Sequence, residues 1–197
     1  MNTRIDRSIH KYFLFRHPFF KTSADDKLKW TPFGLLFLAD IFGAKTASGW
    51  KKQVLIAGAA EGIKYLMSDT LKKMTQQRRP APYAGNHSFP SGHTCTSFST
   101  AEMLRSELKD SLPVLSYSGY LTATAVAAIR VMKNRHWLKD VVAGAAIGII
   151  STGLAYALVN KLSSARKNRS RPDSTEKISS QLHKEARQSK LIEYKKS

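Results

Sequence analysis

The sequence predicts an all-α fold, an antiparallel helical bundle of about five or six helices. Three observations lead to this prediction. Apolar residues recur at helical spacing in several long segments, and prolines and glycines separate these segments. No stretch alternates cleanly enough between polar and apolar residues to require a strand. The chain has 197 residues, enough for one domain with a proper core.

Residues 1–29 form a basic and aromatic arm, in which Tyr12, Phe13 and Phe15 lie among Arg7 and Lys11. Aromatic rings and long cationic side chains suit a membrane interface. The alternative is a peripheral arm packed on the domain, and the residues leave both interpretations open. The first residues lead into no apolar segment of the kind found in a cleavable signal peptide.

Residues 30–160 are expected to form the helical domain. Residues 30–42 are apolar, but about thirteen residues are too few to cross a hydrocarbon core of about 30 Å. The spacing predicts a helix over residues 51–73, where Glu61, Lys64 and Asp69 interrupt the apolar character and argue against a membrane span. The loop over residues 78–90 contains three prolines. Further helices are expected over residues 92–108, 114–132 and 140–160.

The helix predicted over residues 140–160 is the best candidate for a membrane span. It carries no charge after Asp140 and contains Gly144 and Gly148, small residues that suit close helix packing. Its length is about the minimum needed to cross a bilayer. The alternative is a buried central helix of a soluble bundle, and the mean hydropathy of −0.32 keeps that alternative open.

Residues 161–197 are expected to form a basic and partly flexible tail. They hold eleven Lys or Arg against four Asp or Glu, a net charge of +7. The whole chain has a formal net charge of +18, which favours an anionic partner such as a membrane surface, a phosphorylated substrate or a nucleic acid. The single cysteine, Cys95, excludes an intrachain disulfide and is interpreted as a residue of helix packing.

Three short clusters hold the groups needed to handle a phosphate. In chain order they are Lys72 with Arg79-Pro80, then Pro90-Ser91-Gly92-His93, then Arg130, His136 and Asp140. The helix boundaries place all three where one helix ends or the next begins. Short connections between neighbouring helices can therefore gather them at one end of the bundle.

The residue types in these clusters suit phosphoryl transfer. Arg79 and Arg130 present planar forks that match phosphate oxygens, and Lys72 adds a compact charge. The backbone N–H groups of Ser91 and Gly92 precede a helix, a position that favours an anion.

A carboxylate four residues after an imidazole, as in His136 and Asp140, can fix the ring's tautomer and leave the other nitrogen nucleophilic. His93 is then available as a general acid.

This spacing resembles the signature of the type-2 phosphatidic acid phosphatase and vanadium haloperoxidase superfamily. That signature reads Lys, six residues, Arg-Pro; then Pro-Ser-Gly-His; then Ser-Arg, five residues, His, three residues, Asp. Ile129 stands where the family usually has Ser. The resemblance covers roughly residues 50–160, and the six-residue gap after Lys72 favours the phosphatase branch.

The resemblance implies a mechanism without a metal or other cofactor. His136 attacks phosphorus with Asp140 orienting it, and His93 protonates the leaving group and later activates water. Lys72, Arg79, Ser91, Gly92 and Arg130 hold the phosphoryl oxygens. Vanadate is expected to bind as a phosphate mimic. Outside the signature, His87 is interpreted as a rim or substrate contact, whereas His10, His17 and His183 are interpreted as surface residues.

The expected substrate is a phosphorylated lipid or a small phosphomonoester. If the helix over residues 140–160 spans a membrane, the basic tail favours the cytoplasmic side, and the catalytic end faces the opposite side. This predicts a bacterial-type inner membrane with the active site facing the periplasm. A soluble periplasmic acid phosphatase is the alternative, and a vanadium-dependent haloperoxidase is less favoured. A nucleic-acid-binding module accounts for the charge but not for three spaced clusters.

Overall fold

The computed structural model describes residues 4–16, 20–83 and 85–169, and residues 182, 183, 185, 187 and 188. Within these residues the regular structure is entirely α-helical, which confirms the predicted fold class. The helices are α1 (Arg4–Arg16), α2 (Ala24–Leu28), α3 (Thr31–Ile41), α4 (Trp50–Thr75), α5 (Gly92–Leu108), α6 (Pro113–Met132) and α7 (Leu138–Arg169).

Local chemistry explains several helix boundaries. Gln76 takes the left-handed conformation with φ of 42° and ends α4 by donating its N–H to the Lys72 carbonyl. Pro113 starts α6, since its missing N–H has no partner in a first turn anyway. Asn134, with φ of 53°, allows the sharp turn between α6 and α7. The helix predicted over residues 92–108 has the observed bounds.

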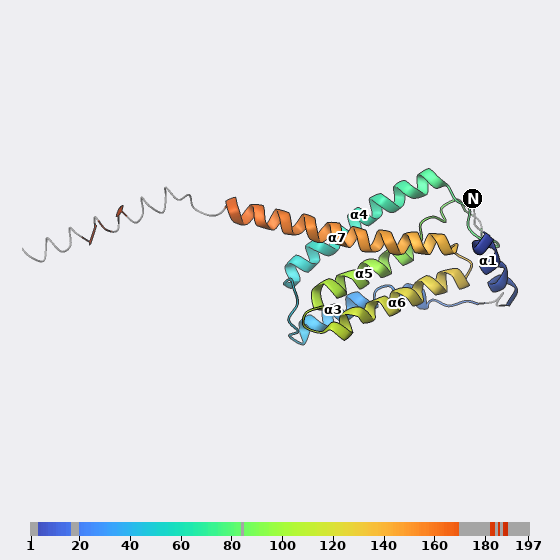
Figure 1. The fold of residues 1–197 in the computed structure, drawn as a ribbon, viewed down its shortest axis with the longest axis horizontal. Coiled ribbons are helices and arrows are strands. Elements are labelled where there is room, and N and C mark those ends of the chain that lie inside the picture. Colours follow the sequence, from blue (N-terminus) through green and yellow to red (C-terminus); the bar gives the residue numbers. More distant parts are fainter. Residues whose placement is uncertain are drawn as a thin grey trace, which may run out of the picture. The chain divides into compact units, whose positions relative to one another are not determined.

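Helix α5 lies at the centre of the bundle and contacts α3, α4 and α6 (Figure 1). One apolar cluster joins α3 to α5 through Leu36, Leu104 and Leu108, which are almost fully buried. A second cluster joins Ile56 of α4 to Ala155 of α7. Burial of these side chains stabilises the bundle, and α5 holds the elements of the catalytic end in place.

Glycines set the close approach between α5 and α7. A Cβ built on Gly148 would lie 2.4 Å from the carbonyl oxygen of Cys95 in α5. A Cβ on Gly144 would lie 2.8 Å from the carbonyl oxygen of Ser91. Side chains at these positions would push the helices apart, so the small residues noted in the sequence form a helix seam. Cys95 is buried in this seam, as its interpretation as a packing residue predicted.

The chain divides into two compact units, Met1–Val159 and Asn160–Ser197. The first unit contains α1 and α2, which are formed by residues of the predicted arm. Helix α7 begins two residues before the predicted helix and continues to Arg169, so residues 161–169 are helical rather than part of a flexible tail. Residues 170–181 and 189–197 lie outside the described residues, as does His17.

Candidate active site

The ends of four helices bring the three clusters together. Helix α4 ends near Lys72, α5 begins at Gly92, α6 ends near Arg130, and α7 begins just after His136. Because successive helices alternate in direction, these ends meet at one end of the bundle, on the right in Figure 1. All eight residues predicted for the site are on the helix ends and loops of this region.

His136 is buried against the loop that joins α4 to α5. Its side chain is only 4% exposed, and Nδ1–H donates to the carbonyl oxygen of Ser88 at 2.7 Å. A carbonyl can only accept a hydrogen bond, so Nδ1 carries the proton, and in the neutral ring Nε2 carries the lone pair. This arrangement leaves Nε2 as the nitrogen available for nucleophilic attack.

Asp140 lies beside His136 as predicted, but it does not accept the hydrogen bond of the ring. The sequence suggested that its carboxylate fixes the tautomer of His136, but the nearest oxygen lies 3.7 Å from Nδ1, and Ser88 accepts the hydrogen bond. The carboxylate instead accepts hydrogen bonds from the Ser88 hydroxyl at 2.5 Å and from the Trp137 N–H at 2.9 Å. Gln77 donates a third, at 3.1 Å. Asp140 therefore caps the start of α7 while keeping its negative charge near His136.

Burial controls the protonation of His136. Loss of solvent lowers the pKa of the imidazole below its ordinary value, and the Arg130 charge lowers it further. Asp140 and the Ser88 carbonyl raise the pKa, but their combined effect is smaller. At neutral pH the ring is therefore neutral, which is the form that can attack an electrophile.

Lys72 and Gly92 lie next to each other, since a Cβ on Gly92 would be 3.8 Å from Lys72 Nζ. The prediction for Ser91 needs a correction, because its backbone N–H donates to the Asp140 carbonyl at 3.0 Å and is not free for an anion. The hydroxyl of Ser91 accepts a hydrogen bond from Thr94 and keeps its own proton to donate.

Arg79 and Arg130 complete a cationic cradle. Burial lowers the pKa of Arg79, and the positive charges of Arg130 and Arg135 lower it further. Arg130 is buried, and its Nε has no hydrogen-bond partner among the described residues. A buried donor without a partner costs about 1–3 kcal/mol, so this atom marks a place for an anionic ligand.

Comparison with known proteins identifies the family. A family model described as the PAP2 superfamily matches residues 53–164, which is more than half of the chain. The chain belongs to the PAP2 superfamily. The lipid A 1-phosphatase of Porphyromonas gingivalis is 35% identical over 116 residues, which make up 58% of this chain and 26% of that protein. The chain thus matches about a quarter of that relative's length.

Two solved structures share the fold. The LpxE structure from Aquifex aeolicus has a TM-score of 0.55 at 22% identity and aligns with 75% of this chain and 93% of that one. The transmembrane PAP2-type phosphatidylglycerolphosphate phosphatase of Bacillus subtilis has a TM-score of 0.54 at 22% identity, over 80% of this chain and 85% of that one. They show the fold, and the match to the PAP2 model confirms the resemblance that the three motifs suggested.

Two site residues that the sequence did not reveal come from α2, outside the region matched by the PAP2 model. Asp25 is fully buried and accepts hydrogen bonds from Arg130 at 2.7 Å and from Lys133 at 2.9 Å. Burial raises the pKa of Asp25, but these two cations outweigh it and leave the pKa below its ordinary value. Asp25 therefore stays ionised and fixes one arm of the Arg130 guanidinium.

Asp26 contacts His93, the histidine of the Pro-Ser-Gly-His motif. His93 Nε2 and Asp26 Oδ1 are 2.7 Å apart, and the Asp26 side chain is 58% exposed. Burial lowers the pKa of His93 below its ordinary value, and the Arg130 and Lys29 charges lower it further, while Asp26 raises it. Asp26 therefore favours the protonated form of His93, the form that can act as an acid.

The arm also packs at the catalytic end through α1. His10 was interpreted as a surface residue, but it is half-buried, with Nδ1 2.8 Å from the Asn134 side-chain oxygen and its ring edge-on to Trp137. His87 is exposed in the loop before the second motif. The contacts of His10 carry no recognisable sequence signal, because Asn134 and Trp137 are distant in the chain.

Among the described residues, one group has the composition of a metal site: Asp25, Asp26 and His93, whose donor atoms lie within 4.8 Å of one another. Both oxygens of Asp25 are already bonded to Arg130 and Lys133. A divalent cation would be placed beside two fixed positive charges, so these residues do not suit a resident metal.

Proposed function

We propose that this chain hydrolyses a phosphomonoester or a diphosphate of a lipid through a phosphohistidine intermediate on His136, without a metal. The observation that carries the proposal is the buried hydrogen bond from His136 Nδ1 to the Ser88 carbonyl. It leaves Nε2 as a nucleophile beside a cradle of two guanidinium groups and one ammonium group. The motif spacing, the PAP2 membership and the lipid phosphatases among the relatives support the same chemistry.

In the first step, His136 Nε2 forms a bond to phosphorus while the bond between phosphorus and the leaving oxygen breaks. The leaving oxygen takes the proton of His93 and departs as an alcohol or a phosphate. The ring of His136 becomes positively charged, and the Asp140 carboxylate at 3.7 Å stabilises that charge.

In the second step, His93, now neutral, takes a proton from water as the water oxygen bonds to phosphorus. The bond between phosphorus and Nε2 breaks and returns its electron pair to His136. Inorganic phosphate leaves, and both histidines regain their starting forms. Lys72, Arg79, Arg130 and the Gly92 N–H neutralise the equatorial oxygens in both steps. Vanadate, which can adopt the same five-coordinate geometry, is expected to inhibit.

A membrane location is supported by the apolar surface. Helix α7 contains a 29-residue segment, Leu138–Arg166, that is long and apolar enough to cross a bilayer, and only 39% of its most apolar window is buried. Large apolar side chains on α3, α4 and α6 are also exposed, among them Phe37, Leu55 and Leu121. Exposed apolar surface on several neighbouring helices suits contact with lipid. The basic residues after α7 favour the cytoplasm, with the catalytic end in the periplasm.

The test is a substrate panel with the full chain in detergent micelles and in EDTA. We expect release of phosphate from phosphatidic acid or another lipid phosphate, inhibition by vanadate, and loss of activity of at least about a hundredfold in His136→Ala. Bound phosphate that survives alkali but is released by acid, as expected of phosphohistidine, should be detected in the wild type only. The exposed His183→Ala is the matched control. Full activity of a folded His136→Ala protein would falsify the proposal.

The same panel separates the alternatives. Hydrolysis of p-nitrophenyl phosphate with no preference for lipids favours a soluble-type acid phosphatase. Vanadate-dependent oxidation of a halide favours a haloperoxidase. Activity that disappears in EDTA and returns with a divalent cation contradicts the metal-independent mechanism.

A further inference from the structure

Helices α4 and α5 enclose a polar pocket of about 290 Å³ beside the catalytic end. At one end the pocket is lined by Lys72, Gly92 and His93 of the site. From there it extends along α4 past Ser68 to Lys64. These lysines and the serine recur every four residues, so they lie along one face of α4 over about 12 Å. The pocket is therefore continuous with the phosphate cradle.

Ser68 indicates that the pocket is built for a ligand. The residue is only 7% exposed, and its hydroxyl is buried without a hydrogen-bond partner in the described part of the chain. A buried hydroxyl without a partner costs about 1–3 kcal/mol. This cost is removed if a bound group supplies an oxygen atom to the Ser68 hydroxyl.

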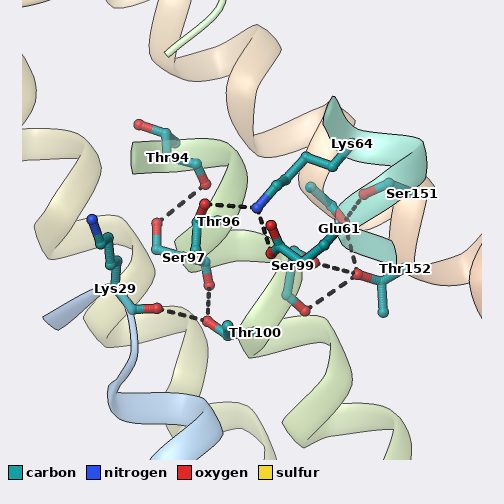
Figure 2. A network of polar contacts seen from close by, with 11 residues as sticks. Lys29, Glu61, Lys64, Thr94, Thr96, Ser97, Ser99, Thr100, Ser151 and Thr152 are labelled. Atoms are coloured by element: carbon teal, nitrogen blue, oxygen red, sulfur yellow. Dashed lines mark hydrogen bonds and ion pairs between the residues drawn. The ribbon is translucent and has the colours of Figure 1, made fainter. Parts of the chain in front are cut away.

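Lys64 gives the pocket its charge. Its ammonium group is buried and bonded to Glu61 and to the Thr96 hydroxyl, so that it points from α4 toward α5 (Figure 2). Three lysines, including Lys29, line the pocket against the two acids Glu61 and Asp69. Asp69 is itself paired with Lys73. Lys29 and Lys64 are likewise paired, with Asp26 and Glu61. The lining is therefore rich in hydrogen-bond donors, which favours a ligand rich in oxygen atoms.

The reaction geometry places one part of the substrate in this pocket. In phosphoryl transfer the attacking and leaving atoms lie roughly in line, on opposite sides of phosphorus. His136 is the attacking group, so the leaving group lies on the opposite side. The acid that protonates the leaving oxygen must be within hydrogen-bond reach of it. His93 has this role, and His93 lines the pocket.

We infer that the pocket between α4 and α5 is a second substrate site, which binds the oxygen-rich leaving group of the substrate through Ser68, Lys64 and Thr96. This inference rests on the proposed phosphatase activity and adds a substrate class to it. The preferred substrate carries oxygen atoms close to the scissile bond, either as a second phosphate or as sugar hydroxyls. A simple alkyl phosphate fills the cradle but leaves the Ser68 hydroxyl without a partner.

The first experiment compares kcat/KM for three substrates with the same alkyl chain: hexadecyl phosphate, hexadecyl diphosphate and a glucose 1-phosphate that carries a hexadecyl group. The variants are Ser68→Ala, which removes the hydroxyl, and Ser68→Leu, which fills the pocket. The matched control is Thr70→Val on the same helix, since Thr70 is exposed and does not line the pocket.

We expect the wild type to prefer an oxygen-rich substrate over hexadecyl phosphate. Ser68→Ala should reduce that preference about fivefold through KM, the effect of one lost hydrogen bond, and Ser68→Leu should reduce it further. A change confined to the diphosphate identifies a second phosphate as the ligand, and a change confined to the glucose derivative identifies hydroxyl groups. If Ser68→Ala and Thr70→Val have the same preference as the wild type, the inference is wrong.

A binding experiment separates this inference from the proposed function. The His136→Ala protein should bind hexadecyl diphosphate or the glucose derivative more tightly than hexadecyl phosphate, and adding Ser68→Ala should reduce the difference about fivefold. This result supports the second site even if the wild type hydrolyses none of the substrates, an outcome that would contradict the phosphatase proposal alone. Equal binding of all three ligands contradicts the second site and leaves the phosphatase proposal standing.

Discussion

The two histidines of the site occupy different surroundings. His136 is 4% exposed and donates a hydrogen bond to the Ser88 carbonyl. It lies next to the Asp140 carboxylate, which also caps the start of α7. The side chain of His93 is 28% exposed, contacts the exposed side chain of Asp26 and lines the polar pocket. The first surrounding is closed and supplied entirely by the PAP2-matched region. The second is open and depends on residues outside the motifs.

This difference suggests that the surroundings of His136 determine the rate of the reaction, whereas those of His93 determine which substrate is preferred. A nucleophile must keep one tautomer and one direction, which a closed and hydrogen-bonded setting provides. An acid for the leaving group must face whatever leaves, so its surroundings vary with the substrate. We therefore expect substitutions near His136 to reduce the rate for every substrate. Substitutions near His93 should instead change pH dependence and substrate preference.

The largest effect is expected from Asp140→Asn, in the closed surroundings of His136. The substitution keeps the shape but removes the charge that stabilises the His136 cation during the first step. We expect kcat to fall roughly 10²- to 10⁴-fold for all substrates, with a smaller change in KM, measured by phosphate release. Asp110→Asn, at an exposed turn between α5 and α6, is the control. A kcat within a factor of about three of the wild type would contradict this role.

Gly148→Leu should disrupt the packing of α7, which follows His136, against α5, which carries His93. The new side chain meets the Cys95 carbonyl of α5, where even a Cβ would lie at 2.4 Å. We expect the free energy of unfolding to fall by about 1–3 kcal/mol or more, measured by chemical denaturation, with loss of activity for every substrate. Gly153→Leu on the same helix is the control, because no atom lies within 4 Å of its Cβ position. Equal effects of both substitutions would contradict a specific seam.

Asp25→Asn tests how much α2, which lies outside the motifs, contributes to the orientation of Arg130 in the cationic cradle. Arg130 and Lys133 lose the carboxylate that they share, so the Arg130 guanidinium is less firmly oriented toward the substrate. We expect kcat/KM to fall about tenfold, the equivalent of about 1.4 kcal/mol, and Asp25→Glu to recover part of it. Phosphate release is the measurement, with melting temperature as a check on folding. No recovery by Asp25→Glu and a general loss of stability would indicate a structural role only.

The smallest effect, and the most specific, is expected from Asp26→Asn. Burial, Arg130 and Lys29 lower the pKa of His93, and Asp26 raises it. Removal of Asp26 lowers the pKa further, so His93 loses its acid proton at a lower pH. The alkaline limb of the kcat/KM profile should therefore shift to lower pH, while the maximal rate changes only a few-fold. An alkaline limb that stays in place excludes His93 as the group that it reports.

The sequence predicted the fold class, the family and the helix ends that meet at the site. The motif residues could be predicted because phosphoryl transfer restricts both residue type and spacing. The 92–108 helix was predicted with its observed bounds because Pro90 precedes it and Pro113 follows it in the chain. Residues 161–169 were taken for a flexible tail on composition, although helical hydrogen bonding continues through them.

The partners of the motif residues could not be predicted in the same way. Asp25 and Arg130 are 105 residues apart, and an acidic pair in a basic arm carries no local sign of that contact. The Ser91 N–H was assigned to the anion because it precedes a helix, but it donates its hydrogen bond to the Asp140 carbonyl. Such competition between a ligand and a neighbouring carbonyl depends on tertiary packing, which motif spacing does not encode.

In the proposed mechanism, the fixed carboxylate of Asp25 has a consequence for turnover. A cradle of unpaired cations would hold inorganic phosphate tightly, and the enzyme would be slowed by its own product. Asp25 offsets part of the Arg130 charge before any ligand arrives, so ground-state affinity for a free anion is moderated. The attraction then grows only as charge develops on the transferring group, which is where binding energy accelerates a reaction.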